Sequence, residues 1–325
     1  MKGELPPLVA IVGPTATGKS SLAVAVAHAL GGPDRVEIVS GDAYQLYRGM
    51  SIGTAAMTMH ERQGIVHHLV GVVDPQVDLS VAQYQRDARA AIQDVEMRGK
   101  RAILVGGSGL YIRAVVDDMQ FPGTDDAVRG ELEKRAAEHG SQALFEELVA
   151  RDPQAAHRMG ASNERRIIRA LEVITITGRP FTAFLPQATY VRPTVTIGVD
   201  CDRSVLDQRV ESRVHTMISQ GLEDEVRSVL QQGMGRTASR AVGYAEFLRY
   251  FDGEISRDQA VADIITHTRR LTRKQMGWFG RDSRTQWIDA LSPSVLHDAL
   301  VCIDRADHGE IFLSDTTPTR RRLGT

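Results

Sequence analysis

Residues 13–20 constrain the fold of this chain more than any other stretch, because they match the phosphate-binding motif G-x-x-x-x-G-K-[ST]. The motif consists of Gly13, Pro14, Thr15, Ala16, Thr17, Gly18, Lys19 and Ser20. The apolar run at 8–12 predicts a buried strand before it, and apolar residues at helical spacing follow it. Strand, glycine-rich loop and helix are the context that this motif needs, so a turn that binds nothing is the weaker alternative.

The motif brings together several groups that attract an anion. Glycines let the backbone curl until successive N–H groups converge on phosphate oxygens, and the helix N-terminus adds partial positive charge. Lys19 supplies a full positive charge, and Ser20 is placed to hold a Mg²⁺ ion. We therefore expect a bound polyphosphate or diphosphate, with Mg²⁺ as the cofactor.

Composition limits the class of protein. The chain has 325 residues, which is enough for two domains or for one domain with a large insertion. Its apolar runs are too short to span a membrane, and no signal-peptide core precedes the first strand. Cys201 and Cys302 lie far apart and without partnering histidines, which indicates neither a disulfide framework nor a zinc site. We expect a cytoplasmic protein with no membrane partner.

Polar residues follow two further predicted strands. Asp42 comes after the strand at 36–40, and Ser108 lies in the glycine-rich turn after the strand at 102–105. Ligands of open α/β sheets collect beyond the carboxyl ends of the strands, so both residues are expected near the phosphate loop. Asp42 would serve as a Mg²⁺ ligand or a general base. The alternatives are a solvated turn aspartate and a turn that is merely flexible.

The pattern changes between residues 118 and 190, where helical stretches at 126–139, 141–151 and 163–177 replace the strand signals. We therefore predict an α/β fold, with a P-loop-type parallel sheet core flanked by helices and an all-helical insertion domain. Residues 1–117 and 191–300 would form the core, and residues 118–190 the insertion. Residues 301–325 are expected to be a disordered tail.

Basic residues cluster although the formal net charge is only −2. Arg165, Arg166 and Arg169 share one predicted helix, and the stretch at 269–284 holds six more basic residues. A third group, at 320–322, lies in the expected tail. Such a run is usually a solvated helix face, but clustered arginines are also what a nucleic-acid backbone requires.

Three kinds of phosphate chemistry remain open on these grounds. A small-molecule kinase that binds ATP has the motif and has arginines for a lid. A nucleotide-gated switch or RNA-binding module would need a second strand ending in aspartate, and the strand at 102–105 ends in glycines instead. A transferase that uses the loop to hold a diphosphate leaving group is the third.

The sequence resembles the tRNA dimethylallyltransferase family in motifs that keep their order from residue 8 to about residue 290. The phosphate loop is one of these motifs. The others are Asp42-x-x-Gln45-x-Tyr47-Arg48-Gly49-Met50-x-Ile52-Gly53-Thr54-Ala55, His67-His68-Leu69, Gly106-Gly107-Ser108-Gly109-Leu110-Tyr111, Asp152-Pro153-x-Ala155-Ala156-x-Arg158, Arg166-x-x-Arg169-Ala170-Leu171-Glu172-Val173, Gly243-Tyr244-x-Glu246 and the Arg-x-x-x-x-Trp-Phe signature at 273–279. The Asp-x-x-Gln-x-Tyr-Arg block makes the resemblance specific, because kinases with the same loop lack it.

The resemblance implies transfer of a dimethylallyl group from dimethylallyl diphosphate to the exocyclic amine of the adenosine beside the tRNA anticodon. It implies that Asp42 is the general base and that Gln45 orients the base edge. Ser108 stands where the family usually has threonine, and Ala43 replaces a common serine. The diphosphate would be held by the phosphate loop and Arg240.

The resemblance also implies which residues contact the tRNA anticodon stem-loop. They are Asp42, Ala43, Tyr44, Gln45, Ser108, Arg129, Arg165, Arg166, Ile167, Ile168 and Arg169. The adenosine would have to turn out of the anticodon loop to react, as in other base-modifying enzymes. We expect the protein to act as a monomer.

Overall fold

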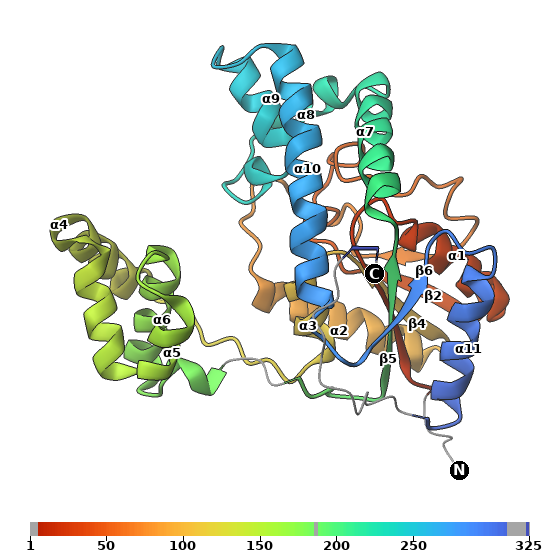
Figure 1. Cartoon of the computed structure of the whole chain (residues 1–325), viewed down its shortest axis with the longest axis horizontal. Coiled ribbons are helices and arrows are strands. Elements are labelled where there is room, and N and C mark those ends of the chain that lie inside the picture. Colours follow the sequence, from red (N-terminus) through yellow and green to blue (C-terminus); the bar gives the residue numbers. More distant parts are fainter. Residues whose placement is uncertain (1–5, 185–187, 311–322, 325) are drawn as a thin grey trace. The chain divides into compact units, whose positions relative to one another are not determined.

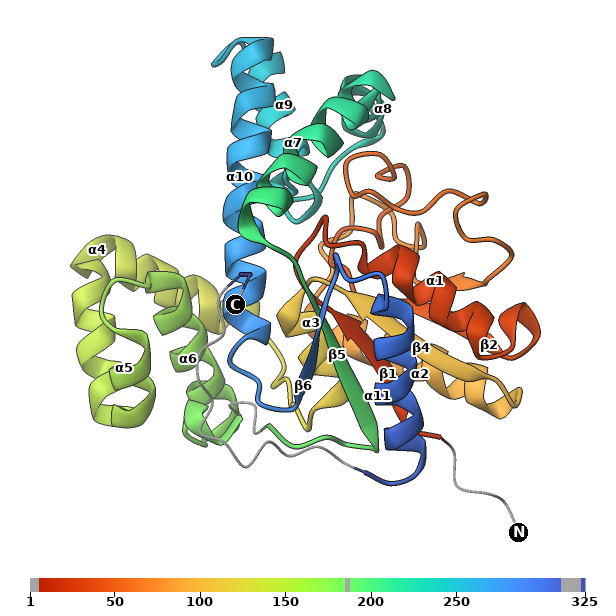
Figure 2. The same cartoon turned by 45° about the vertical axis from the view of Figure 1, so that its right-hand side comes forward.

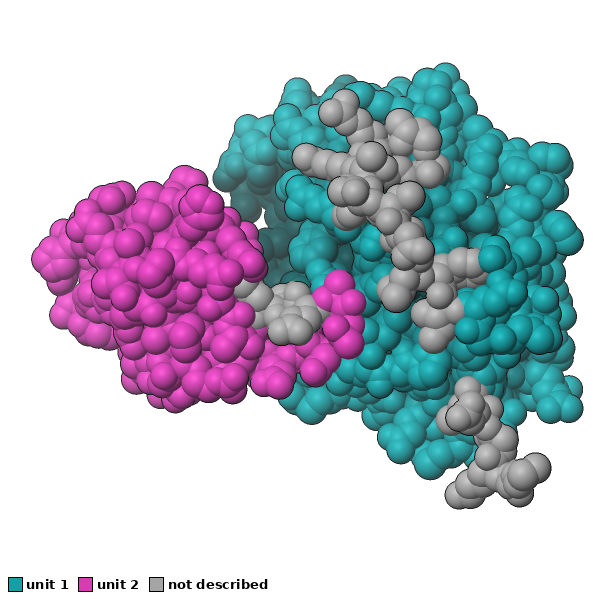
Figure 3. Space-filling view, turned by 60° about the horizontal axis from the view of Figure 1, so that its bottom comes forward, with its two compact units in different colours: residues 1–116, 190–325 teal, residues 117–189 magenta. Residues whose placement is uncertain are grey.

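The computed structural model describes residues 6–184, 188–310 and 323–324. It divides the chain into two compact units, coloured in Figure 3. Unit 1 comprises residues 1–116 and 190–325, and unit 2 comprises residues 117–189. Unit 2 corresponds to the helical insertion expected at 118–190.

Unit 1 is built on a parallel sheet, whose six strands lie within the described ranges in the order β3-β2-β4-β1-β5-β6 (Figure 1). The strands are β1 Leu8–Val12, β2 Val36–Ser40, β3 His67–His68, β4 Arg101–Gly106, β5 Thr194–Asp200 and β6 Thr285–Asp289. Every pairing is parallel, so the phosphate loop, Asp42 and the turn after β4 come to one edge of the sheet. The predicted α/β fold is confirmed.

Alternate residues of the strands pack into two separate hydrophobic cores, one on each face of the sheet. Val9 and Ile11 of β1 pack with α1 Lys19–Ala29 and α11 Val295–Asp307 on one face of the sheet. Leu8, Ala10 and Val12 pack on the other face with α2 Val81–Met97 and α3 Gly109–Val116. Burial on both faces explains why the strands read as continuous apolar runs in the sequence.

A second helical layer stands beyond the carboxyl edge of the sheet (Figures 1 and 2). It contains α7 Arg203–Ser219, α8 Leu222–Gln232, α9 Tyr244–Phe251 and α10 Arg257–Phe279, with the short helix η3 Ala238–Arg240 before α9. Its apolar faces form a core of their own with Tyr47 and Met50, which follow β2. This packing fixes the chain after Asp42 against helices distant in the sequence.

Unit 2 is helical, with α4 Asp126–Arg151, α5 Pro153–Met159, α6 Glu164–Thr177 and the short helix η2 Phe181–Phe184. The helix α4 is interrupted at Gly140, whose φ of 80° breaks the helical path between the two predicted helices. Leu144, Leu148, Ile167 and Leu171 lie in the core of this unit.

The expected disordered tail is wrong for residues 301–307, because α11 continues to Asp307. Ala299, Ile303 and Ala306 recur at helical spacing and are buried against the sheet, which stabilises this helix. The arginines at 320–322 lie outside the described residues. No helix in the described part of the chain is long and apolar enough to cross a membrane.

Candidate active site

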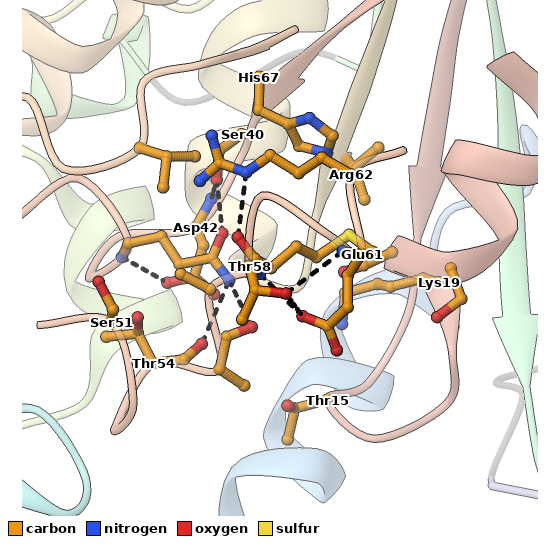
Figure 4. A pocket seen from close by; sticks show the side chains of 18 of the residues that line it. Thr15, Lys19, Ser40, Asp42, Ser51, Thr54, Thr58, Glu61, Arg62 and His67 are labelled. Atoms are coloured by element: carbon orange, nitrogen blue, oxygen red, sulfur yellow. Dashed lines mark hydrogen bonds between the residues drawn. The ribbon is translucent and has the colours of Figure 1, made fainter. Parts of the chain in front are cut away.

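A cavity of about 530 Å³ opens at the carboxyl edge of the sheet (Figure 4). Its walls come from the phosphate loop, the end of β2, the loop at 51–62, β3, the end of β4 and α7. The polar side chains that line it include Thr15, Lys19, Ser20, Asp42, Gln45, Ser51, Thr54, Thr58, Glu61, Arg62, His67, Arg213, Thr216 and Gln220. The cavity is therefore the place where an anion and the Asp42 carboxylate would meet.

The phosphate loop has the backbone that anion binding requires. Gly13, Ala16 and Gly18 have φ values of 145°, 66° and 90°, which turn the chain back on itself. At Gly13 a Cβ would lie 2.5 Å from the carbonyl oxygen of Val199, so no side chain fits there. No side chain caps the N-terminus of α1, and its first N–H groups are left for a ligand.

Lys19 begins α1 and donates from Nζ to the carbonyl oxygen of Pro14 at 3.1 Å. Burial and the nearby charge of Arg213 lower the pKa of Lys19 to about 8, against the opposing effect of Asp42. Burial also lowers the pKa of Arg213. Two cations thus face one cavity at a cost in free energy, and an anion between them would relieve it.

Two residues that sequence reasoning missed hold the phosphate loop from the helical layer. Arg213 of α7 donates from Nη1 to Thr15 Oγ1 at 3.1 Å, and Gln275 of α10 accepts from the Thr15 N–H at 2.9 Å. Arg213 belongs to none of the motifs in the sequence, and Gln275 lies within the signature at 273–279 without being marked there as a phosphate-loop contact. Because 198 and 260 residues separate them from Thr15, only the fold could bring them there.

Asp42 follows β2 in a turn that its own carboxylate closes. Oδ1 accepts from the N–H groups of Tyr44 at 2.9 Å and Gln45 at 3.4 Å. Both bonds use the same oxygen, which fixes the side chain in its turn and leaves Oδ2 for another partner. The side chain is half-buried and lines the cavity (Figure 4).

The Gln45 carboxamide is occupied within the protein. Its Oε1 accepts from Ser40 Oγ at 3.0 Å, and its Nε2 donates to the carbonyl oxygens of Thr54 at 3.2 Å and Ala55 at 3.5 Å. Gln45 therefore fastens the cavity-lining loop to the end of β2. Orientation of a nucleobase by Gln45 remains a prediction.

The same loop is held from the other side by Glu225 of α8. The carboxylate accepts from the N–H groups of Ser51 at 2.9 Å, Ile52 at 2.8 Å and Gly53 at 2.9 Å. The Tyr244 hydroxyl donates to it as well, at 2.5 Å. A Cβ at Gly53 would lie 2.5 Å from the Tyr244 ring, so the loop fits here only with glycine. This wall of the cavity is thus fixed before any ligand binds.

Ser108 supports the Asp42 turn and is not among the residues that line the cavity. Its Oγ accepts from the Ala43 N–H at 3.3 Å. The ends of β2 and β4 approach closely here, since a Cβ at Gly106 would lie 2.3 Å from the carbonyl oxygen of Gly41. Ser108 is a positioning residue in this structure, and its contact with substrate remains a prediction.

Arg240 is exposed in η3 and is also absent from the lining of the cavity. The charge of Arg240 acts on Tyr44. Burial and the charge of Asp42 raise the pKa of Tyr44, and the charge of Arg240 opposes this rise. The cation that the structure places beside Lys19 is Arg213. Diphosphate binding by Arg240 remains a prediction.

In unit 2 the predicted tRNA-binding residues fall into different environments. Arg165 and Arg166 are exposed on α6, whereas Ile167 and Ile168 are 0% and 7% exposed. The two isoleucine side chains belong to the unit's core, because they occupy the inward face of an amphipathic helix. Contact of Ile167 and Ile168 with RNA remains a prediction.

Arg129 and Arg169 are held by a buried carboxylate. Arg129 Nη2 donates to both oxygens of Glu172 at 3.0 Å, and Arg169 Nη1 donates to Oε2 at 2.8 Å. Glu172 is 0% exposed; burial acts to raise its pKa, but bonds from Arg169 and Arg129 lower it overall. Arg169 also binds the carbonyl oxygens of Pro122 and Gly123. These two arginines thus fasten the start of α4 to α6.

The described residues contain no group of three His, Cys, Asp or Glu side chains that could cage a metal ion. Mg²⁺ does not need such a cage, since it is often held by one or two protein oxygens together with phosphate oxygens and water. Ser20 at the start of α1 lines the cavity, and Asp42 and Glu61 line it too. This oxygen-only donor set fits a Mg²⁺ ion that arrives with a phosphate ligand.

Comparison with known proteins gives consistent matches along nearly the whole chain. Residues 45–282 match the family model described as IPP transferase. The tRNA dimethylallyltransferase of Bifidobacterium animalis subsp. lactis (strain AD011) is 50% identical over 304 residues, covering 93% of this chain and 88% of that relative. The tRNA dimethylallyltransferase of Kineococcus radiotolerans is 52% identical over 290 residues, covering 87% and 91%.

Solved structures of the same family are also similar to this chain. The tRNA isopentenylpyrophosphate transferase of Bacillus halodurans is 34% identical with a TM-score of 0.69, over 94% of this chain and 99% of that one. A eukaryotic dimethylallyltransferase acting on tRNA has a TM-score of 0.77 at 22% identity, over 98% and 82%, and shares the fold.

Proposed function

The chain belongs to the tRNA dimethylallyltransferase family, and from this premise we propose that it moves a dimethylallyl group from dimethylallyl diphosphate to the exocyclic amine of the adenosine beside the tRNA anticodon. The observation that supports the proposal is the shared cavity, where Lys19 and Arg213 face the same space as Asp42. In the reaction a C–N bond forms at the allylic carbon and a C–O bond breaks. The adenosine amine loses one proton, and diphosphate leaves.

The diphosphate would lie against the phosphate loop. The N–H groups at the start of α1, Lys19 and Arg213 are donors aimed at one place, and negative charge on the departing oxygen grows as the C–O bond breaks. Donors fixed in advance stabilise this charge more than they stabilise the bound substrate. The bond between Arg213 and Thr15 keeps the second cation at the loop before substrate arrives.

Ser20, with Glu61, would hold Mg²⁺ at this diphosphate. When bound, the ion supplies charge neutralisation to the phosphate oxygens. Lys19 and Arg213, which line the same cavity, would add positive charge of their own.

Asp42 would take the proton from the adenosine amine. An exocyclic amine of a nucleobase is a poor nucleophile, so removing its proton while the C–N bond forms lowers the barrier. The turn bonds to Oδ1 hold the carboxylate in place and leave Oδ2 to act as the base. Ser108 would contribute by fixing the Ala43 N–H and hence the turn itself.

The tRNA would be bound in part by unit 2 through Arg165 and Arg166, the exposed cations of α6. Backbone phosphates fix the position of an RNA, whereas an unstacked base is read in a pocket. The reacting adenosine would leave the stack of the anticodon loop to reach Asp42.

The experiment incubates the protein with tRNA, Mg²⁺ and dimethylallyl diphosphate, digests the RNA and measures nucleoside masses. A dimethylallyl mass gain on adenosine is the expected result, absent when dimethylallyl diphosphate is omitted. A parallel reaction replaces the prenyl donor with ATP. Phosphoryl transfer from ATP to a small molecule, without prenylated adenosine in the first reaction, would overturn the proposal in favour of a kinase.

A further inference from the structure

The loop at 51–62 gives the cavity much of its apolar surface. The phosphate loop and Arg213 would take the diphosphate, which leaves the prenyl group to the apolar part of the lining. The loop contributes Ile52, Ala55, Ala56 and Met57 to this part, and the sheet contributes Ile38 and Val105. The proposed chemistry assigns no role to the residues that hold this loop in place.

The sheet part of the apolar lining is fixed by its surroundings, whereas the loop is not. Ile38 and Val105 belong to the core that the sheet shares with α1. Residues 41–66 are all described, and they form no helix and no extended strand. Ala55 has a φ of 51°, in the left-handed region that a residue with a side chain rarely adopts. The position of the loop therefore depends on side chains that hold it from outside.

Glu225 of α8 makes the largest set of these outside contacts. Its Oε2 accepts from the N–H groups of Ser51 and Ile52, and its Oε1 accepts from the N–H group of Gly53. Successive N–H groups around one anion form a strong cradle, because hydrogen bonds to an ionised acceptor are roughly twice as strong as neutral ones. Among the described residues no cation lies within 4.0 Å of Glu225, so the loop backbone is the principal partner of its charge.

Tyr244 of α9 secures this carboxylate. The side chain is buried, and burial followed by the charge of Glu225 raises the pKa of the hydroxyl, which therefore keeps its proton and donates to Oε1 at 2.5 Å. The ring also meets the loop directly. A Cβ at Gly53 would lie 2.5 Å from the Tyr244 ring and 2.9 Å from Leu222 Cδ1, so the loop lies flush against α8 and α9 at this point.

Glu225 and Tyr244 do not line the cavity, so they act on it only through the loop. The link is Ile52, whose N–H group binds Glu225 and whose side chain lines the cavity. Gln45 holds the next residues of the loop from the sheet, through the carbonyl oxygens of Thr54 and Ala55. An allylic diphosphate is anchored at its phosphate end, so the position of this wall determines how long a prenyl chain fits.

We propose that Glu225 is a positioning residue that limits the length of the prenyl chain accepted by the cavity. With the loop held against α8, the cavity takes the five-carbon dimethylallyl group and excludes a ten-carbon chain. Without the carboxylate, the wall at Ile52 yields and admits the longer chain. A site rejects a larger substrate only when its wall cannot give way. The inference rests on the proposed function, since it concerns the prenyl donor of that reaction.

The principal experiment measures kcat/KM for dimethylallyl diphosphate and for geranyl diphosphate, a ten-carbon allylic donor, from the masses of the modified adenosines. Glu225→Gln keeps the size of the side chain, but its amide NH₂ group cannot accept from a backbone N–H. We expect the ratio of the geranyl to the dimethylallyl value to rise about tenfold. An unchanged ratio, even with both values lowered, would make Glu225 a stabilising contact only and would overturn the inference.

Glu223→Gln is the matched control, because Glu223 lies on the same helix and pairs with Arg227 and Arg257 instead of with the loop. Its donor ratio should equal that of the wild type. A ratio that rises as much in Glu223→Gln as in Glu225→Gln would show that any loss of charge on α8 loosens the cavity, and would overturn the specific role of Glu225.

A second variant tests the wall with the contacts of Glu225 intact. Ile52→Ala shortens the side chain that lines the cavity and keeps the N–H group that binds Glu225. The donor ratio should again rise about tenfold. This variant decides the question if Glu225→Gln does not fold, because an unchanged ratio would show that the prenyl chain does not lie against this wall.

Tyr244→Phe grades the effect. It removes one of the bonds to Glu225 and keeps the ring against Gly53, so the donor ratio should rise only about threefold. A rise larger than that of Glu225→Gln would assign the role to the phenol and overturn the inference. Absence of prenylated adenosine from the wild-type chain with either donor would overturn the proposed function, whereas prenylation with one donor ratio in all variants would overturn the length limit alone.

Discussion

The cavity and the contact between α4 and α6 each hold two basic side chains, but the surroundings of the two pairs differ. Lys19 and Arg213 line the cavity, whereas Arg129 and Arg169 join α4 to α6. Arg129 and Arg169 share the buried carboxylate of Glu172. Lys19 and Arg213 have no carboxylate within 4.0 Å among the described residues, and burial and mutual repulsion lower the pKa of Lys19. A cation with an internal partner holds the fold together, whereas a cation left without one is available to an anionic ligand.

The largest expected effect concerns the carboxylate that shares the cavity with the unpaired cations. Asp42→Asn keeps an oxygen that can accept from Tyr44 and Gln45 but removes the base, so turnover should fall about 10²- to 10⁴-fold. Single-turnover prenylation of tRNA measures this, with RNA binding as the control. Asp42→Ala also removes the turn bonds and should be at least as slow. Turnover close to wild type in Asp42→Asn would rule out Asp42 as the base.

The next effect tests the repulsion between Lys19 and Arg213. Since the pKa of Lys19 is about 8 in the free protein, kcat/KM for dimethylallyl diphosphate should decline above about pH 8 as the ammonium group loses its proton. Arg213→Gln should lower kcat/KM about 10- to 100-fold, and it should move this decline to higher pH because one cause of the lowered pKa is removed. A decline that stays at the same pH in the variant would show that Arg213 does not act on Lys19.

The third prediction concerns Glu172, the buried partner of Arg129 and Arg169, and is measured as a change in stability. Glu172→Gln should lower the free energy of unfolding of unit 2 by about 3 kcal/mol, because two arginines lose a buried counter-charge. Thermal denaturation measures it, and Glu147→Gln, which removes a half-buried partner of Arg135 and Arg151, is the matched control with a smaller effect. The pKa of Glu172 is lowered in the folded protein, so its contribution is present above the unfolded pKa and is lost as pH falls through the folded value.

The smallest effect concerns the exposed arginines of α6. Replacing Arg165 and Arg166 with Gln should weaken tRNA binding and reduce its salt slope by about 0.7 to 0.9 for each phosphate contact that is lost. Filter binding across a salt series measures the slope. Arg151→Gln removes an arginine of the same unit that Glu147 already pairs at 3.0 Å, and should change the slope less. Equal salt slopes in the wild type, the Arg165 and Arg166 double variant and Arg151→Gln would show that Arg165 and Arg166 do not contact RNA phosphates.

The helices and strands were predicted well because the residues that determine each of them are adjacent in the sequence. The run at 8–12, the motif at 13–20 and the periodic residues after it are contiguous, and the strand, loop and helix appear where the sequence placed them. The break at Gly140 was predictable for the same reason, since a single residue ends one helix and begins the next. The error at 301–307 arose because a polar, charged stretch hid apolar residues at helical spacing.

By itself, then, the sequence determined the parallel α/β core, the anion loop, the place of Asp42 at the sheet edge and membership of a family. Tertiary structure alone decided which cations are available. It brought Arg213 and Gln275 to Thr15 from distant helices, and it turned Arg129 and Arg169 toward Glu172. The physical reason is that a side chain's charge can be read from its identity, but whether that charge is neutralised depends on neighbours that only the folded chain supplies.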